Sequence, residues 1–207
     1  MTCEPEQVVW IARHGTRVDN IDPAWKATAE RPFDPELAPQ GVAEAWKLAR
    51  RLEGERIDFV YASPFLRAVQ TAAPIAEIAG NPIRIEPGFG EWMLPMWFES
   101  VPELLPEAEV GWSCSSLDTS YVSPFLMRCP EVWEEMIRRT GETIRRVAAD
   151  GCNLVVVGHG ASVIGSVAGL LGIDQEHTPP PPIACLYRLA RNGDDWRVEL
   201  DADTGHL

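Results

Sequence analysis

Residues 8–15 read Val-Val-Trp-Ile-Ala-Arg-His-Gly, an apolar run that stops at an arginine, a histidine and a glycine. The five apolar residues predict a buried strand, and Gly15 gives the backbone the freedom to turn at its end. Open α/β sheets bind ligands at the carboxyl ends of their strands. Arg13 and His14 therefore stand where such a ligand would bind, although an ordinary turn at a strand end is the alternative.

A second apolar run far down the chain ends in the same way. Residues 153–160 read Asn-Leu-Val-Val-Val-Gly-His-Gly, with His159 between two glycines. The chain has four histidines, and the other two, His177 and His206, lie in segments of loop or tail composition. Two strand ends that each carry a histidine predict a shared site. For either histidine alone, a purely structural role is the alternative.

A third segment, residues 60–72, predicts a strand that leads into a helix. Ser63 is expected to cap this helix and Pro64 to occupy its first position. Arg67 then falls in the first turn, where free backbone N–H groups and the helix dipole favour an anion. Arg17, shortly after the first histidine, adds a second guanidinium group, and such groups match phosphate oxygens in pairs. The pattern therefore predicts a phosphate site.

Strand and helix patterns alternate along the chain. Strands are expected near residues 8–12, 57–62, 83–86, 153–158, 183–189 and 196–200, and helices near 39–53, 64–79, 130–149 and 161–171. This alternation predicts an α/β fold, a three-layer sandwich with helices on both faces of a mostly parallel sheet. A turn at 191–194 predicts an antiparallel end strand. We expect one domain over residues 1–207, with a substrate-loop insertion at about 92–130.

The motifs together resemble the histidine phosphatase superfamily, which includes cofactor-dependent phosphoglycerate mutase. The resemblance runs from about residue 8 to residue 171 and is carried by four ordered blocks, at 13–17, 63–67, 70–72 and 158–160. It implies that His14 is the phosphorylated nucleophile. It further implies that Arg13, Arg17 and Arg67 hold the phosphate and that His159 contacts it.

The leaving oxygen of a phosphate ester needs a proton, so the site also needs a general acid. Glu91, in the segment Phe-Gly-Glu-Trp, is the candidate, because phosphatases that resemble this chain use a glutamate at this point. Glu86 and Asp19 are the alternatives. We expect His14 to attack as a neutral imidazole and His159 to be protonated in the complex, with Glu91 as the base when water hydrolyses the phosphohistidine.

Departures from the family pattern narrow the expected activity. Mutases typically have a glutamate or glutamine and then a serine or threonine after Arg-His-Gly, whereas this chain has Thr16 and Arg17. Acid phosphatases usually have His-Asp at the second histidine, where this chain has Gly160 after the histidine. The resemblance therefore favours the phosphatases related to suppressors of T-cell receptor signalling and to ecdysteroid phosphate phosphatase. The enzymatic alternative is a phosphoglycerate mutase or a sugar bisphosphatase. The non-enzymatic alternative is a domain that binds phosphate without turnover.

Tryptophans are frequent in the expected insertion. Trp92 and Trp97 follow the candidate acid, and Trp25 lies in the loop after the first histidine. Inserted loops at strand ends commonly set substrate choice, so we expect these residues to form a lid for hydrophobic or aryl phosphate esters. Core packing, the commoner fate of tryptophan, is the alternative.

Composition limits the partners. A net charge of −13 argues against nucleic acid, which is bound mainly through basic surface. The sequence has no spacing typical of metal ligands, so we expect no metal and no cofactor. The five cysteines are scattered, the N-terminus does not resemble a signal peptide, and the sequence has no long apolar run. These features predict a cytoplasmic protein without membrane contact. The expected partner is a small-molecule or peptide phosphomonoester, and a homodimer stays open.

Overall fold

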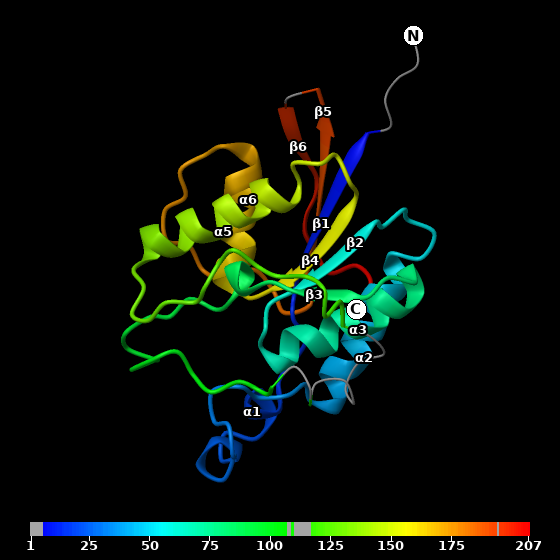
Figure 1. The fold of residues 1–207 in the computed structure, drawn as a ribbon. Coiled ribbons are helices and arrows are strands. Elements are labelled where there is room, and N and C mark those ends of the chain that lie inside the picture. Colours follow the sequence, from blue (N-terminus) through cyan, green and yellow to red (C-terminus); the bar gives the residue numbers. More distant parts are fainter. Residues whose placement is uncertain (1–5, 107–108, 110–116, 194) are drawn as a thin grey trace.

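The computed structural model describes residues 6–106, 109, 117–193 and 195–207. Six strands form one sheet in the order β3-β2-β4-β1-β5-β6 (Figure 1). They are β1 (Gln7–Arg13), β2 (Phe59–Ala62), β3 (Ile83–Ile85), β4 (Leu154–Gly158), β5 (Leu186–Asn192) and β6 (Asp195–Asp203). Strands β3, β2, β4 and β1 pair in parallel, and β5 pairs antiparallel with β1 and β6. The expected mostly parallel sheet with an antiparallel end is confirmed.

Helices cover both faces of the sheet, as the alternating pattern predicts. Helices α2 (Pro39–Arg51) and α3 (Leu66–Ala79) lie on one face, and α5 (Trp133–Val147) and α6 (Gly160–Leu171) lie on the other (Figure 1). Side chains of β1 alternate between these layers, because successive residues of a strand point to opposite faces. Trp10 packs in the core cluster beneath α2 and α3, whereas Ile11 packs in the cluster beneath α5 and α6.

Three short helices within the described residues lie near the ends of these strands. They are α1 (Val18–Ile21), η1 (Trp25–Ala27) and η2 (Pro87–Phe89). Between η2 and α5 the described residues are mostly irregular, and residues 107–108 and 110–116 of the expected insertion lie outside the described part. Met93 and Phe98 of this segment pack on Phe65 in a small separate core cluster. The segment therefore attaches to the start of α3.

Several element boundaries differ from the prediction by a few residues, among them the starts of β2, α3, α5 and β5 and the end of β6, and two of them bear on the site. Helix α3 begins at Leu66 with Phe65 as its N-cap, so Ser63 is not the cap and Pro64 is not in the first turn. The Asp34 carboxylate accepts a hydrogen bond from the Leu66 N–H (2.8 Å) and supplies the cap from a distant loop. Strand β5 starts at 186 rather than 183, after a residue, Ala184, in the left-handed region (φ 54°).

Helices α5 and α6 approach each other very closely. A Cβ atom at Gly169 of α6 would lie 2.4 Å from the Cα atom of Gly141 in α5. A Cβ atom at Gly165 would likewise lie 1.9 Å from the hydroxyl of Thr140. Glycine is therefore required at position 169 by the proximity of the two backbones, whereas at position 165 it makes room for the Thr140 side chain.

Within the described ranges, no helix combines the length and the apolar character that crossing a bilayer requires.

Candidate active site

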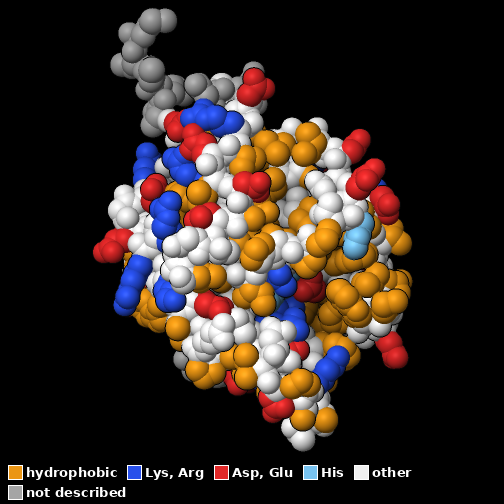
Figure 2. Space-filling model, turned by 180° about the vertical axis from the view of Figure 1, so that it is seen from behind, with side chains coloured by type: hydrophobic (Ala, Val, Ile, Leu, Met, Phe, Trp, Pro, Cys, Tyr) orange, Lys and Arg blue, Asp and Glu red, His pale blue; other side chains and the backbone are white. Residues whose placement is uncertain are grey.

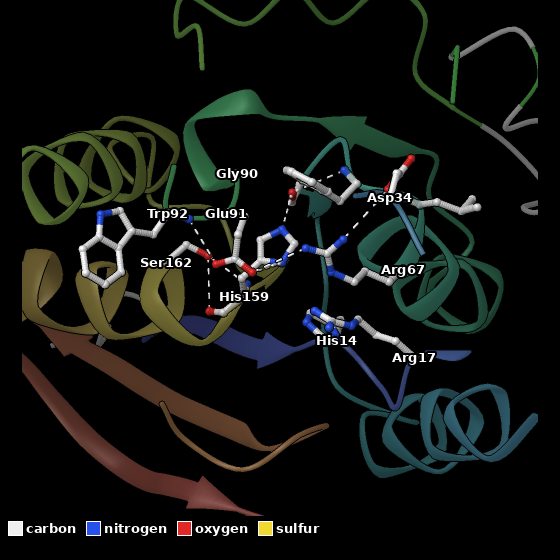
Figure 3. Close-up of polar contacts among 12 residues, drawn as sticks. His14, Arg17, Asp34, Arg67, Gly90, Glu91, Trp92, His159 and Ser162 are labelled. Carbon is white, nitrogen blue, oxygen red and sulfur yellow. Dashed lines mark hydrogen bonds and ion pairs between the residues drawn. The ribbon is translucent and has the colours of Figure 1, made fainter. Parts of the chain in front are cut away.

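The two predicted histidines lie side by side because their strands are neighbours. Strands β1 and β4 pair in parallel with Arg13 opposite Gly158, so His14 and His159 follow at adjacent strand ends. Their ring centroids are 5.3 Å apart, and both side chains are buried. Figure 3 shows the His159 ring between Glu91 and Arg67, with Glu91 directed toward His159 and the His14 ring below Arg67 in this view. The sheet register thus joins residues that are far apart in the sequence.

His14 is held as a neutral imidazole with one defined tautomer. Its Nδ1 atom lies 2.8 Å from the carbonyl oxygen of Gly15. Because a carbonyl oxygen only accepts, Nδ1 carries the proton and Nε2 keeps its lone pair. Burial lowers the pKa of His14 well below its usual value, and the Arg67 guanidinium lowers it further. The prediction of a neutral first histidine agrees with this environment.

The turn after His14 is fixed by a close backbone contact. A Cβ atom at Gly15 would lie 2.7 Å from the carbonyl oxygen of Gly41, at the start of α2. The Gly15 N–H also donates to the hydroxyl of Thr71 in α3 (3.0 Å). Glycine at position 15 is therefore required by packing as well as by the turn.

His159 is oriented from two sides. Its Nε2 atom lies 2.7 Å from the hydroxyl of Ser63, and its backbone N–H donates to the hydroxyl of Ser162 (2.8 Å). Its Nδ1 atom lies 3.4 Å from Glu91 Oε2. Burial lowers the pKa of His159 well below its usual value, with Arg67 adding to the effect. A protonated His159, as expected for the complex, is disfavoured here and would need a bound anion to offset its burial.

Three arginines surround the histidines, as the motifs predict. Arg67 lies in the first turn of α3, 2% exposed, and burial lowers its pKa to about 10, so it stays charged at neutral pH. Arg13 donates to the carbonyl oxygen of Pro181 (2.5 Å), and Arg17 binds Asp19 through two hydrogen bonds (2.8 and 2.9 Å).

Several buried donors of this cluster have no hydrogen-bond partner among the described residues. They are Nε of Arg13, Nε and Nη1 of Arg67 and Nδ1 of His159. Buried polar groups are normally satisfied, so this set fits an oxyanion that accepts several hydrogen bonds at once. In the part of the chain that the structure describes, no three His, Cys, Asp or Glu side chains group together as metal ligands would.

Glu91 is the carboxylate that lies beside the histidines. Its Oε2 atom is 3.4 Å from Arg67 Nη2 and 3.4 Å from His159 Nδ1, and its Oε1 atom accepts the Trp92 N–H (3.0 Å). The two alternative acids are bound to other groups, although Asp19 also lies near the site, where it pairs with Arg17. Glu86 is buried and accepts from the Gly88 N–H (2.6 Å), and Asp19 pairs with an arginine. Of these three carboxylates, Glu91 is therefore the one that lies against a histidine of the cluster, and it stays the candidate acid.

A residue that the sequence reasoning missed, Arg139, holds the backbone next to this acid. Its guanidinium group binds both carboxylate oxygens of Glu131 (2.7 and 2.8 Å). It also donates to the carbonyl oxygens of Gly88 (2.7 Å), Gly90 (3.3 Å) and Glu91 (3.3 Å). The signal was present, because position 139 falls on the buried face of α5, where an arginine needs partners.

A second residue missed from the sequence is Asp34. Its carboxylate is buried, accepts backbone N–H groups of Leu66 (2.8 Å) and Leu105 (3.1 Å), and lies 4.0 Å from Arg67 Nη1. Burial raises the pKa of Asp34, and these contacts oppose the rise. Asp34 thus supports Arg67 from a loop that carries no local sequence signal for this role.

An open cleft of about 390 Å³ extends from the arginines to the surface. It is lined by Arg17, Asp19, Lys26, Pro32, Phe33, Pro35, Arg67, Glu91, Met96, Trp97 and Phe98. In Figure 2 charged side chains lie in a hollow bordered by hydrophobic ones. The cleft therefore combines a charged floor with apolar walls.

The three tryptophans of the expected lid occupy different places. Trp97 lines the cleft and is 55% exposed. Trp92 does not line the cleft but packs edge-to-face on Trp97 (6.3 Å between ring centroids) and on Trp133 (5.2 Å), and its Nε1 donates to the carbonyl oxygen of Glu131 (2.9 Å). Trp25, in η1, is not among the residues that line the cleft, although its neighbour Lys26 is.

Comparisons with known proteins agree with this geometry. A model of the histidine phosphatase superfamily (branch 1) matches residues 9–204. Mouse ubiquitin-associated and SH3 domain-containing protein B is 30% identical over 133 residues, and the Drosophila melanogaster ecdysteroid-phosphate phosphatase is 28% identical over 194 residues. These alignments cover 59% and 75% of this chain but 21% and 26% of those relatives, so the chain spans about a quarter of their length.

A solved structure has the same fold over nearly the whole chain. The ecdysone phosphate phosphatase of Bombyx mori, crystallised with tungstate, superposes with a TM-score of 0.74 at 21% identity and covers 97% of each chain. The chain belongs to the histidine phosphatase superfamily, branch 1. The predicted similarity to this group of proteins is confirmed by the ubiquitin-associated and SH3 domain-containing protein and by the ecdysteroid-phosphate and ecdysone phosphate phosphatases.

Proposed function

We propose that the protein is a metal-independent phosphomonoesterase that acts through a phosphohistidine on His14. The observation that carries the proposal is the neutral His14 imidazole, with its free Nε2, beside buried donors of Arg13, Arg67 and His159 that lack partners among the described residues. The phosphatase names of the relatives and the tungstate bound to one of them support an oxyanion at this place.

In the first step, Nε2 of His14 attacks phosphorus and the bond between phosphorus and the ester oxygen breaks. The N–P bond forms as the ester oxygen leaves with its electron pair and takes a proton from the Glu91 carboxyl group. The arginines neutralise the charge on the phosphoryl oxygens, which is the main catalytic requirement of phosphoryl transfer. His159 donates from Nδ1 to the same oxygens.

In the second step, water attacks phosphorus and the N–P bond breaks. The Glu91 carboxylate takes a proton from the water, inorganic phosphate forms, and Nε2 of His14 regains its lone pair. The Gly15 carbonyl holds the proton of Nδ1 throughout, so His14 returns to the tautomer with which it began.

The apolar walls of the cleft favour an aryl or other hydrophobic leaving group. Phe33, Phe98 and Trp97 lie along the cleft that leads to Arg67. Aromatic side chains bind rings by stacked or edge-to-face contacts. We therefore propose aryl phosphate esters as the preferred substrates.

The test is hydrolysis of p-nitrophenyl phosphate by the full chain, with and without a chelator. We expect turnover that the chelator leaves unchanged, and a loss of at least about 1,000-fold in His14→Ala, because the covalent route needs the nucleophile. Rapid quench and mass spectrometry should find a phosphoryl group on the peptide that contains His14. Equal activity of the wild type and His14→Ala would refute the proposal.

The alternatives have distinct outcomes in the same assays. Isomerisation of phosphoglycerate that depends on a bisphosphorylated primer would support a mutase. Tight binding of tungstate without turnover of any phosphate ester would support a phosphate-recognising domain.

A further inference from the structure

Lys26 lines the cleft and has no carboxylate partner among the described residues. The other cations of the cleft are paired, Arg17 with Asp19 and Arg67 with Glu91. The carboxylates of the cleft are these same two, so neither is left to neutralise Lys26. The cleft therefore carries one positive charge that its own acids do not balance.

The ammonium group of Lys26 has a defined position at the apolar wall. Its Nζ atom lies 4.1 Å from the centroid of the Phe33 ring, a cation–π contact. Phe33 in turn packs on Phe98, with ring centroids 5.5 Å apart. A leaving group that lies along this wall thus meets an aromatic surface and an ammonium group together.

Charge composition makes this lysine unusual. The sequence contains two lysines, Lys26 and Lys47, and its net charge is −13. The electrostatic field of a protein with this net charge disfavours the binding of anions. A local positive charge in the cleft would favour their binding there. In the proposed function, the arginines around the histidines bind the phosphate itself.

We propose that Lys26 binds a second negative group on the leaving group, so that the preferred substrates are aryl phosphate monoesters that also carry a carboxylate or similar anion. This inference rests on the proposed phosphatase function for its catalytic consequence. The aryl ring would pack on Phe33, and the second anion would pair with the ammonium group.

The experiment compares two esters that differ only in charge: 3-(4-phosphooxyphenyl)propanoate and its primary amide. Because the rings are the same, the ratio of their kcat/KM values isolates the contribution of the carboxylate. We expect the wild type to prefer the carboxylate about 3- to 10-fold at low salt, and less in 1 M salt, since exposed pairs are weak and screened. Lys26→Met should bring the ratio close to one.

Two further variants test the role of charge and of position. Lys26→Arg keeps the charge and should keep the preference. Lys47→Met, which removes an exposed lysine of α2 outside the cleft, should leave the ratio at its wild-type value. A wild-type ratio of one, or an undiminished preference in Lys26→Met, would overturn the inference.

Binding separates this inference from the proposed function. Calorimetry on His14→Ala measures the affinities of both esters without turnover. A preference for the carboxylate that disappears in His14→Ala/Lys26→Met would support the role of Lys26 even if the wild type hydrolysed neither ester. Hydrolysis through His14 with equal affinities for both esters would support the phosphatase function and refute the role of Lys26.

Discussion

The hydroxyl of Ser63 lies 2.7 Å from Nε2 of His159, at the end of the strand next to the one that carries the histidine. Since Nδ1 of His159 lies beside Glu91, this contact determines which nitrogen can donate into the site. A serine that donates to Nε2 leaves the proton on Nδ1, which is the tautomer that the proposed mechanism requires.

Replacing Ser63 by alanine should lower kcat/KM for p-nitrophenyl phosphate about 10-fold, because a buried histidine nitrogen loses its partner and the tautomer is no longer fixed. A double-mutant cycle checks the cause. In a His159→Ala background the same serine change should have little further effect. Additive losses would show that Ser63 acts through something other than His159.

Arg139 should act as a positioning residue for the general acid. We expect Arg139→Met to lower kcat/KM for phenyl phosphate about 30- to 100-fold, but for p-nitrophenyl phosphate only a few-fold, because a good leaving group needs less protonation. Arg139 donates to three backbone carbonyl oxygens at and before Glu91. Without these hydrogen bonds the backbone would shift and displace the Glu91 carboxyl group from the leaving oxygen.

The neighbouring Arg138 offers a matched control for this prediction. It is exposed on the same helix and lines surface hollows that include neither His14 nor His159. Arg138→Met should therefore leave the rates of both esters near wild type. Equal losses for the two esters in Arg139→Met would indicate a general structural defect rather than a misplaced acid.

The two buried histidines should make stability fall on acidification. Burial lowers the pKa values of His14 and His159 in the folded state, so below about pH 6.5 the unfolded chain binds protons that the folded chain does not. Each histidine then removes up to about 1.4 kcal/mol of stability per pH unit, until its folded pKa is reached. Urea unfolding at pH 7, 6 and 5 should give a steeper loss for the wild type than for His159→Gln. Parallel pH profiles would contradict the prediction.

The glycine contact between α5 and α6 should be intolerant of a methyl group. Gly169→Ala would place a Cβ atom 2.4 Å from Gly141 Cα, so we expect a loss of about 2 to 3 kcal/mol in the free energy of unfolding. Gly54→Ala is the comparison, because its Cβ atom meets nothing within 4 Å and costs only the strain of a φ of 84°, about 1 kcal/mol. Equal losses in urea titrations would mean that the helices move apart easily.

The histidines and Arg67 could be predicted from the sequence because their signals are local. An apolar run that ends in glycine marks a strand end, and parallel strands place their carboxyl ends at one edge of the sheet. Arg139 could also have been found, since it lies on the helix face of Met136 and Thr143, which are both buried.

Other parts of the site depend on contacts between distant segments, which no local pattern reveals. The preference of serine for helix N-caps predicted that Ser63 caps the helix that follows it. In the structure its hydroxyl instead contacts His159, 96 positions away. Asp34 supplies the cap of α3. Trp92 lies in a segment whose composition is typical of a lid. Its ring nevertheless packs on Trp133 and His177, which are distant in the sequence. In both cases tertiary contacts override the local preference.

Strand β4 lies between β1 and β2 in the finished sheet, although it follows both in the chain. A nascent chain that ends before residue 158 therefore contains β1 and β2 but lacks the complete strand that pairs with both. Synthesis would have to place β4 between two segments already made, and only this insertion sets His159 beside His14. Phosphatase turnover would then report the completion of the central sheet, which makes it a sensitive reporter of late events in folding during translation.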